Sequence, residues 1–472
     1  MQPMLLSTIA EAVGGRLEDA PDPHLIVDQP AVFDSRKATA GALFIALTGN
    51  TADGHDYARA AVKNGAVAAL TTRPAGVPAI VVDDDVLAAF ARLGHHLVRH
   101  GLTDTQVIAI TGSAGKTSTK DLIAQLLPAA GPTVATPQSF NNEIGLPLTI
   151  TMADRTTRYL VLEMGARGIG HIRDLTRIAP PHISVVTNVG TAHVGEFGGR
   201  DNIAQAKGEI VEALPGGGLA VLNADDPLVR AMANRTRARI VTYGLAPEAT
   251  VRAADITLND QGQPSYTLHT PEGSAHVHLQ FVGEPQVYNS LAAAAVARET
   301  GLPLSRIAAL LSAATTQSRW RMETHTRADN VTIVNDAYNA NPDSMRSSLD
   351  ALAAMARGHG QRAIAVLGQM NELGEDARTA HEDVGRHAAT LNLDQVIVVG
   401  GDEAGWMQKA ASNAGAHALH LPDQETALQL LRSTLQPGDV VLVKASRGVQ
   451  LQELAEALLQ PDPGPASAYG LF

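Results

Sequence analysis

The segment from Val107 to Asp121 has the residue types of a phosphate-binding loop. A short apolar run ends at Ile110, a loop with two glycines follows, and Lys116 and Thr117 open a helix-like segment. In this order of strand, loop and helix, backbone N–H groups and the positive helix N-terminus hold phosphate oxygens. Lys116 would reach the terminal phosphates, and the Thr117 hydroxyl would coordinate magnesium. The strict pattern needs glycine where this chain has Ile110, so a glycine-rich turn that binds nothing is the alternative.

Three more side chains are candidates for a magnesium and phosphate site. Glu163 ends a predicted strand, His193 lies in the loop after the next strand, and Lys207 sits on the following helix. Magnesium prefers carboxylate and phosphate oxygens, which makes Glu163 a reasonable ligand near Thr117. On residue chemistry alone, a lone histidine such as His193 is more often a satisfied loop or core residue. On residue chemistry alone, Lys207 is likewise more often an exposed lysine on a helix surface than a ligand.

Polar residues elsewhere allow both a functional and a structural interpretation. Asn141 and Asn142 are either a capped turn or donors that face phosphate or substrate. Arg321 could cross between domains and neutralise charge on a transferring phosphoryl group. Asp336 follows a predicted strand, and Pro342 a few residues later is typical of a helix start.

The elements that must position these residues form three predicted α/β domains, over residues 1–100, 101–318 and 319–472. A chain of 472 residues is too long for one core. Strands are expected at 43–47, 67–70 and 79–82, then at 107–110, 159–163, 183–188 and 219–223, and finally at 331–335, 363–367, 396–399 and 440–443. Helices are expected at about 57–64, 117–127, 169–178, 201–213, 343–357 and 377–390. This alternation predicts mostly parallel sheets that bind ligands at the C-terminal ends of their strands.

Composition excludes several classes of function. A net charge of -12 argues against general binding to nucleic acid or an anionic membrane. The chain has no cysteine, which excludes disulfides, thiolate zinc sites and a cysteine nucleophile. The N-terminal residues lack the pattern of a signal peptide, and no apolar run approaches the ~20 residues of a membrane span. We therefore expect a cytoplasmic protein without membrane insertion.

Seven short motifs together resemble the Mur ligase family, the ATP-dependent amide-bond ligases of peptidoglycan synthesis. They occur in the family's order along essentially the whole chain, and jointly they are highly specific. The motifs are residues 111–118, 141–145, 163–166, 187–193, 206–209, 338–342 and 443–447. The resemblance implies a small N-terminal substrate domain, a central P-loop domain with a mostly parallel sheet, and a C-terminal Rossmann-like domain. The last would bind the incoming amine and part of ATP.

Within the family, residues 367–374 resemble the members that add D-alanyl-D-alanine to UDP-N-acetylmuramoyl-tripeptide. The Asp-Asn-Pro-Arg motif of the diaminopimelate-adding members is missing. Lysine-adding members lack that motif too, so a ligase that adds the third peptide residue is the alternative. Two alternative functions lie outside the ligase class. One is a nucleotide or sugar kinase, and the other is a nucleotide-regulated binding protein without turnover.

The family chemistry implies that ATP phosphorylates the tripeptide carboxylate and that the dipeptide amine attacks the acyl phosphate. ATP and Mg²⁺ are the implied cofactors, the two peptide substrates are the implied partners, and a monomer is expected. Residues implied to contact the nucleotide are Gly112, Ser113, Ala114, Gly115, Lys116, Thr117, Ser118, Asn289, Arg321 and Asp336. Implied metal ligands are Thr117, Glu163, His193 and Lys207, the last as a carbamate. Expected catalytic residues are Lys116, Lys207, His193 and Arg321.

The residues predicted to bind substrate are spread over all three predicted domains. Candidates for the uridine-diphosphate part are Ser35, Arg36, Asp53 and His55, although Asp, Gly and Ser in these segments also suit plain surface turns. Further candidates near the peptides are Asn141, Asn142, Asn341 and Lys444. Two positions depart from the family: Trp320 replaces a glycine, which predicts a stiffer hinge, and Ala114 replaces a frequent asparagine.

Overall fold

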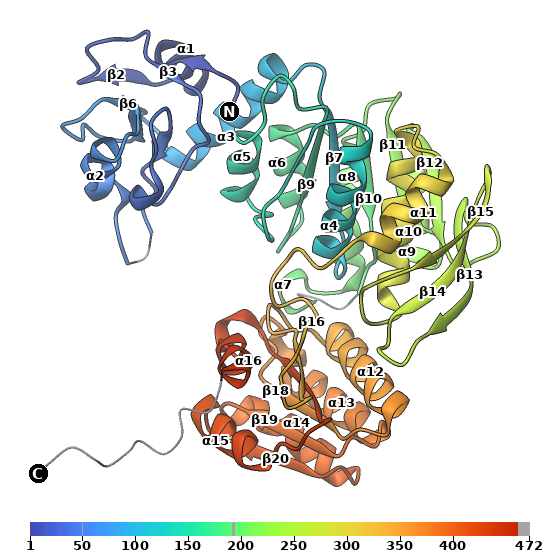
Figure 1. Cartoon of the computed structure of the whole chain (residues 1–472). Helices are drawn as coiled ribbons and strands as arrows, with labels where there is room; N and C mark the ends of the chain where they lie inside the picture. Colours follow the sequence, from blue (N-terminus) through green and yellow to red (C-terminus); the bar gives the residue numbers. More distant parts are fainter. Residues whose placement is uncertain (50, 191–193, 461–472) are drawn as a thin grey trace, which may run out of the picture.

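The computed structural model describes residues 1–49, 51–190 and 194–460. Figure 1 shows three bodies in chain order, the first in blue, the second from cyan to yellow and the third from orange to red. Each body contains its own main sheet, and helices pack beside the sheets. This arrangement confirms the predicted α/β fold. Among the described helices, none has the length and apolar character that a bilayer crossing requires.

The N-terminal body is built on a sheet of order β2-β6-β5-β4, in which β4, β5 and β6 are parallel. Its strands are β1 (Met4–Leu5), β2 (Arg16–Glu18), β3 (Ile26–Val27), β4 (Leu43–Ile45), β5 (Ala68–Thr71) and β6 (Ala79–Val81). Its helices are α1 (Leu6–Val13), η1 (Ser35–Lys37), η2 (Gly54–Tyr57), α2 (Ala58–Lys63), α3 (Val86–His96) and η3 (Leu97–Gly101). The predicted helix over 57–64 begins earlier, as a 3₁₀ turn at Gly54, because the Asp53 carboxylate accepts the His55 N–H and caps it.

The central body has a sheet of order β15-β14-β13-β12-β11-β10-β7-β9-β8. Its strands are β7 (Gln106–Thr111), β8 (Thr133–Ala135), β9 (Tyr159–Glu163), β10 (Ile183–Val186), β11 (Leu219–Asn223), β12 (Arg239–Gly244), β13 (Val251–Leu258), β14 (Pro264–Thr270) and β15 (Gly273–His278). Its helices are α4 (Lys116–Leu126), η4 (Leu127–Ala129), α5 (Gly145–Ile150), α6 (His171–Ile178), α7 (Val194–Phe197), α8 (Arg200–Glu212), α9 (Pro227–Ala231), η5 (Met232–Arg235), α10 (Pro285–Glu299) and α11 (Leu304–Ala313).

Strand β7 shows why this sheet is covered on both faces. Successive side chains of a strand point to opposite faces, so a strand buried on both sides is apolar at every position. Ile108 and Ile110 enter the core shared with α4, α10 and α11, whereas Val107 and Ala109 enter the core shared with α3, α5, α6 and α8. β7 therefore lies in the middle of the body, and the loop at its C-terminal end opens next to β9 and β10.

The C-terminal body has a sheet of order β16-β17-β21-β18-β19-β20, parallel except for β16. Its strands are β16 (Glu323–Thr326), β17 (Thr332–Asn335), β18 (Ala363–Leu367), β19 (Gln395–Val399), β20 (Ala418–Leu421) and β21 (Val440–Lys444). Its helices are α12 (Pro342–His359), η6 (Gly374–Asp376), α13 (Ala377–Thr390), α14 (Asp402–Asn413), α15 (Gln424–Thr434), η7 (Arg447–Val449) and α16 (Gln452–Leu459). One core lies against α12, α13 and α14 and the other against α15 and α16, as in a doubly wound fold.

Candidate active site

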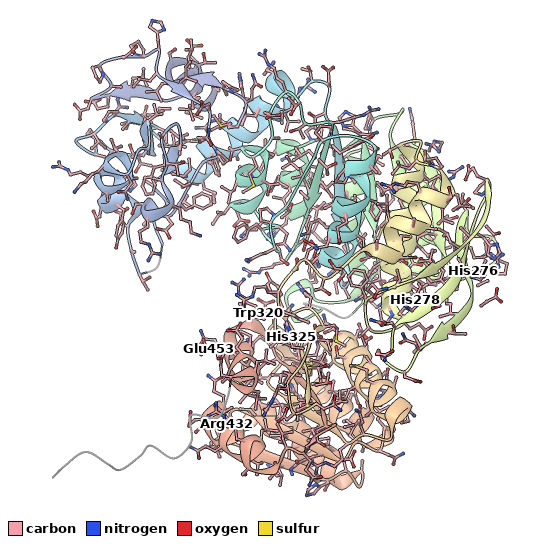
Figure 2. All side chains as sticks on the ribbon, viewed as in Figure 1. His276, His278, Trp320, His325, Arg432 and Glu453 are labelled. Atoms are coloured by element: carbon pink, nitrogen blue, oxygen red, sulfur yellow. The ribbon has the colours of Figure 1, made fainter. Side chains whose placement is uncertain are left out.

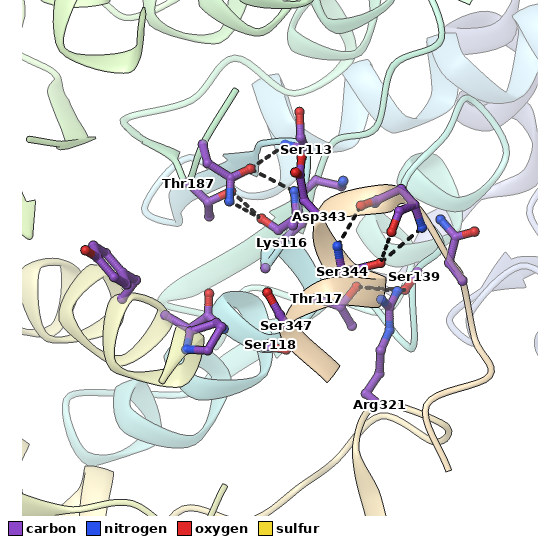
Figure 3. A pocket seen from close by; sticks show the side chains of 18 of the residues that line it. Ser113, Lys116, Thr117, Ser118, Ser139, Thr187, Arg321, Asp343, Ser344 and Ser347 are labelled. Carbon is purple, nitrogen blue, oxygen red and sulfur yellow. Dashed lines mark hydrogen bonds between the residues drawn. The ribbon is translucent and has the colours of Figure 1, made fainter. Parts of the chain in front are cut away.

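A cavity of about 1300 Å³ lies between the central and C-terminal bodies. The loop after β7 and the start of α4 line it from one side, and the start of α12 lines it from the other. Figure 3 shows the two sides meeting, with Ser113, Lys116 and Thr117 near Arg321, Asp343 and Ser344. The C-terminal ends of β7, β9 and β10 point to this cavity, which is where parallel sheets bind their ligands.

The loop between β7 and α4 has the geometry that a phosphate cradle needs. Gly115 has a φ of 79°, and a Cβ atom there would lie 2.4 Å from the Asn289 Oδ1 atom. Glycine at this position therefore lets the backbone pass close to α10 just before α4 begins. Lys116 is the first residue of α4, and its ammonium donates to the Gly112 carbonyl at 2.7 Å. Thr117 and Ser118 follow in the first turn, whose N–H groups lack intrahelical partners.

Ile110 stands where the strict loop pattern has glycine, and the structure shows why an apolar residue fits. It belongs to β7, pairs in register with Glu163 of β9, and is fully buried in the core. The loop is therefore shorter than in the strict pattern, because β7 continues through Ile110 to Thr111. The side chain of Asn188 supports the shorter loop, since its amide oxygen accepts the N–H groups of Ser113 and Ala114 at 3.1 and 2.9 Å.

The side-chain oxygens of Glu163 and Thr117 lie close together at the cavity. The Thr117 hydroxyl donates to Glu163 Oε2 at 2.9 Å, and the Asn141 amide donates to Glu163 Oε1 at 2.7 Å. Ser139 Oγ lies 2.8 Å from the Thr117 hydroxyl. Within the described ranges no three carboxylate or imidazole side chains converge on one point. These hard oxygen donors fit Mg²⁺, which would complete its coordination with nucleotide phosphates and water.

Lys207, which is buried, and Lys116, which is half-buried, put two ammonium groups at the same cavity. Lys207 is 4% exposed and lines the cavity from α8. Burial and repulsion from Lys116 hold the pKa of Lys207 well below its usual range. The pKa of Lys116 is also lowered by burial, which the charge of Glu163 partly opposes. Two neighbouring cations, one of them buried, are costly without counter-charge, so this side of the cavity favours anionic ligands. His193 lies outside the described residues.

Arg321 carries positive charge from the C-terminal body to the phosphate loop. Its guanidinium donates to the hydroxyls of Thr117 and Ser139, each at 3.3 Å, and stacks 4.1 Å from the centre of the Tyr338 ring. Its Nε atom is buried and has no hydrogen-bond partner in the described parts of the chain. The guanidinium therefore retains donor capacity at the cavity, next to Thr117.

The hinge before Arg321 contains Trp320 at the junction of the two bodies (Figure 2). Trp320 has a φ of 60°, a left-handed conformation that a glycine adopts without strain. Its backbone N–H donates to Glu323 at 2.9 Å and its indole N–H to Glu456 at 3.0 Å. These bonds hold a bulky residue in a conformation that glycine would adopt more easily.

On the C-terminal side, Asp336 and Lys444 bond to each other. The Lys444 ammonium donates to the Asp336 carboxylate and, at 3.0 Å, to the Asn339 carbonyl. Ser348 Oγ and the Met322 N–H also donate to the Asp336 carboxylate, at 2.7 and 3.0 Å. Burial lowers the pKa of Lys444, and the neighbouring Asp336 charge opposes that shift.

Three asparagines predicted at the site line the cavity while also serving the fold. Asn341 caps α12, because its amide oxygen accepts the Ser344 N–H at 2.9 Å. Asn142 accepts the Gly145 N–H at 3.0 Å at the start of α5. Asn289 accepts the Thr119 hydroxyl at 3.3 Å, beside Gly115. The contacts of Asn142 and Asn341 therefore agree with the capping interpretation. Asn142, Asn289 and Asn341 also border the cavity.

The four predicted residues of the N-terminal body do not line this cavity. Arg36 is an exposed side chain paired with Asp34 at 2.8 Å, and Ser35 is buried beside it. The His55 ring lies between Asp53 Oδ1 at 2.6 Å and the Thr72 N–H, which donates to its Nε2 atom at 3.0 Å. These side chains form a separate polar region, and their predicted role in holding the uridine-diphosphate part stays a prediction.

The sequence interpretation did not name several cavity residues, and Ser139 and Arg447 are two of them. Ser139 bonds to Thr117 and Arg321, but a single serine between a strand and two asparagines carries no signal of its own. Arg447 lines the cavity and stacks 5.3 Å from the centre of the Tyr338 ring. It ends the motif at 443–447, so its place beside Lys444 was the signal that could have identified it.

The fold and the cavity define a nucleotide-binding α/β protein, and comparison with known proteins specifies its class. Three family models match in chain order: the Mur ligase family catalytic domain over residues 32–101, the Mur ligase middle domain over 110–297, and the Mur ligase glutamate ligase domain over 320–447. The chain belongs to the Mur ligase family.

Individual relatives share nearly the whole length. The UDP-N-acetylmuramoyl-tripeptide–D-alanyl-D-alanine ligase of Mycobacterium tuberculosis is 46% identical, over 97% of this chain and 98% of that protein. A crystal structure of MurF from Acinetobacter baumannii is 31% identical with a TM-score of 0.86, covering 98% of this chain and all of the other. The MurF ligase of Thermotoga maritima in complex with ADP is 30% identical with a TM-score of 0.78, covering 92% of this chain and 97% of the other.

Proposed function

We propose that this chain is an ATP-dependent ligase that joins D-alanyl-D-alanine to UDP-N-acetylmuramoyl-tripeptide and releases ADP and phosphate, a step of peptidoglycan precursor synthesis. Relatives named for this reaction match the chain over almost its full length. The structural observation that supports the proposal is that residues from two bodies form hydrogen bonds with the same hydroxyl group. Thr117 of the phosphate loop bonds to Glu163 from its own body and to Arg321 from the C-terminal body.

The arrangement suits activation of a carboxylate by phosphoryl transfer. A carboxylate oxygen of the tripeptide attacks the terminal phosphorus of ATP, the bond to the bridging oxygen breaks, and ADP leaves. The backbone of the phosphate loop and Lys116 would hold the phosphates. Arg321 would stabilise charge that develops on the transferred group, because its guanidinium lies next to Thr117 and its buried Nε atom has no hydrogen-bond partner among the described residues.

In the second step the dipeptide amine attacks the carbonyl carbon of the acyl phosphate. The new C–N bond forms, inorganic phosphate leaves with the electrons of the C–O bond, and the amine loses a proton. Arg447 is the cavity cation we propose for the dipeptide carboxylate, because Lys444 is buried against Asp336 while Arg447 is exposed. Its stacking on Tyr338 leaves a planar donor group at the cavity wall.

We propose that Thr117 and Glu163 hold Mg²⁺, with Lys207 as a further ligand in carbamate form. Bound magnesium would offset the repulsion between ATP and the carboxylate. Carbamylation would replace a buried cation beside Lys116 with an anionic oxygen donor, which removes the charge repulsion described above. If this is correct, Lys207→Ala is inactive and short carboxylates restore part of the activity. Absence of rescue from an inactive but folded variant would contradict the carbamate.

A ligation assay that resolves substrates tests the function itself. D-alanyl-D-alanine, lysine and diaminopimelate are offered separately, each with its matching UDP-linked precursor, and the product mass is measured. We expect a product only with the dipeptide and the UDP-linked tripeptide. A product with lysine or diaminopimelate would assign the chain to the third-residue step instead, and steady-state turnover of ATP that yields a stable phosphorylated product without any amine would indicate a phosphotransferase. The use of ATP and a UDP-linked substrate favours the cytoplasm.

A further inference from the structure

Gly208 follows Lys207 within α8, and its presence needs an explanation. Glycine in a helix interior costs about 1 kcal/mol relative to alanine, because it loses more backbone freedom on folding. Gly208 is buried and lies well inside the helix, four residues before its end. A requirement for space rather than helix propensity must therefore keep a side chain out of this position.

The side chain of Arg235 occupies that space. A Cβ atom on residue 208 would lie 1.9 Å from Arg235 Nη1 and 2.2 Å from its Cζ atom. From the end of η5, the guanidinium donates to the carbonyls of Ala204 at 3.1 Å and Gln205 at 2.8 Å. It also pairs with the Glu212 carboxylate at 2.7 Å. A carbonyl oxygen has two lone pairs, so these bonds add to the helical ones.

A second contact fixes the same helix from a different direction. The buried Glu209 carboxylate accepts the N–H groups of Gly170 at 2.7 Å and Arg173 at 3.0 Å, at the start of α6. Gly208 and Glu209 thus connect α8 to η5 and to α6, while Lys207 points into the cavity. Arg235 itself does not line the cavity, so it acts on the site only through α8.

We propose that Arg235 is a positioning residue: it clamps the turn 204–208 of α8 and so sets where the Lys207 side chain enters the cavity. This inference rests on the proposed role of Lys207 at the magnesium site. Consecutive residues of a helix are about 100° apart, so a rotation or slide of the turn at Gly208 displaces Lys207 directly. Partners that orient a ligand in this way typically change activity by about 10- to 100-fold when removed.

The test uses four variants of the full chain: Arg235→Ala, Arg235→Lys, Gly208→Ala and the double variant of Gly208→Ala with Arg235→Ala. Arg230→Ala is the matched control, because Arg230 lies on the neighbouring α9 and forms a surface pair with Glu248 at 3.9 Å. We expect kcat to fall about 10- to 100-fold in Arg235→Ala and in Gly208→Ala, with the KM for ATP little changed. Arg235→Lys should recover part of kcat, because it restores one donor near Glu212.

The double variant gives the sharpest readout. If Gly208 exists to make room for Arg235, removing Arg235 leaves space for the alanine methyl, and the double variant is no worse than either single variant. Additive losses would overturn the link between the two residues. Amide hydrogen exchange of 204–209 supplies a readout independent of turnover, and it should quicken in Arg235→Ala and not in Arg230→Ala.

Two results would separate this inference from the proposed function. If Lys207→Ala is inactive while folded Arg235→Ala keeps full kcat, only the positioning role fails, even if Arg235→Ala melts at a lower temperature. If Lys207→Ala remains active, the proposed role of Lys207 fails, whatever hydrogen exchange shows for Arg235.

Discussion

The two sides of the cavity differ in how far their positive charges are balanced by negative ones. The phosphate-loop side, formed by Lys116, Thr117, Glu163 and Lys207, has two ammonium groups and one carboxylate. The C-terminal side, formed by Asp336, Asn341 and Lys444, balances its one cation with one anion at hydrogen-bond distance. The excess positive charge of the first side favours an anionic ligand, whereas the charges of Asp336 and Lys444 on the second side already balance each other. We therefore expect the phosphates to bind on the phosphate-loop side, where Arg321 of the C-terminal body donates to the Thr117 hydroxyl.

The largest effect should follow from removing Lys116. We expect Lys116→Ala to lower ligation by about a thousandfold or more, because no other loop side chain can replace its charge at the terminal phosphates. Phosphate release in the presence of all three substrates measures this loss. Lys63→Ala, an exposed lysine of α2, is the control and should retain full activity. Retained activity in Lys116→Ala would remove the phosphate-loop assignment.

Arg321→Ala tests whether the C-terminal body contributes charge to the transfer step. We expect kcat to fall about a hundredfold while ADP affinity, measured by calorimetry, changes only a few-fold. Arg321→Lys should restore little, because an ammonium cannot reach both Thr117 and Ser139 while stacking on Tyr338. An equal loss in ADP affinity and kcat would make Arg321 a simple nucleotide-binding residue.

Lys444→Met should affect stability, in contrast to Lys116→Ala. The substitution leaves the Asp336 carboxylate buried without its cation, which costs about 3–5 kcal/mol of unfolding free energy. Combining it with Asp336→Asn removes both charges and should recover part of that loss. Urea unfolding measures both variants. If Lys444→Met unfolds like the parent chain, the pair is not a structural element and the contrast between the two sides fails.

The smallest effect is expected for Arg36→Ala in the N-terminal body. The Arg36 side chain is 86% exposed and its recorded partner is the neighbouring Asp34, so its removal should leave folding and kcat unchanged. A rise of a few-fold in the KM for the UDP-linked tripeptide would fit a contact with the diphosphate. Arg16→Ala, which removes another exposed arginine that pairs with an aspartate, serves as the control. An unchanged KM would leave Arg36 without a role in substrate binding.

The sequence determined those features that depend on neighbours along the chain. The apolar runs predicted β9, β11, β18 and α13 at the residues where the structure has them, because apolar strand and helix periods are local properties. The order of strand, glycine loop and Lys116-Thr117 likewise predicted where α4 begins, within one residue. Family resemblance then named Arg321 and Asp336, which no local pattern singles out.

Only the tertiary structure decided which of these residues meet. Glu163 and Thr117 are 46 positions apart, and Arg321 is 204 positions from Thr117, so no sequence period relates them. The structure also showed that Lys444 and Asn341 already have structural partners, because burial forces polar groups to find bonds inside the protein. Gly208 is the clearest case. Its sequence position beside Lys207 was plain from the start, but the reason for glycine lies in Arg235, which reaches it only through the packing of η5 against α8.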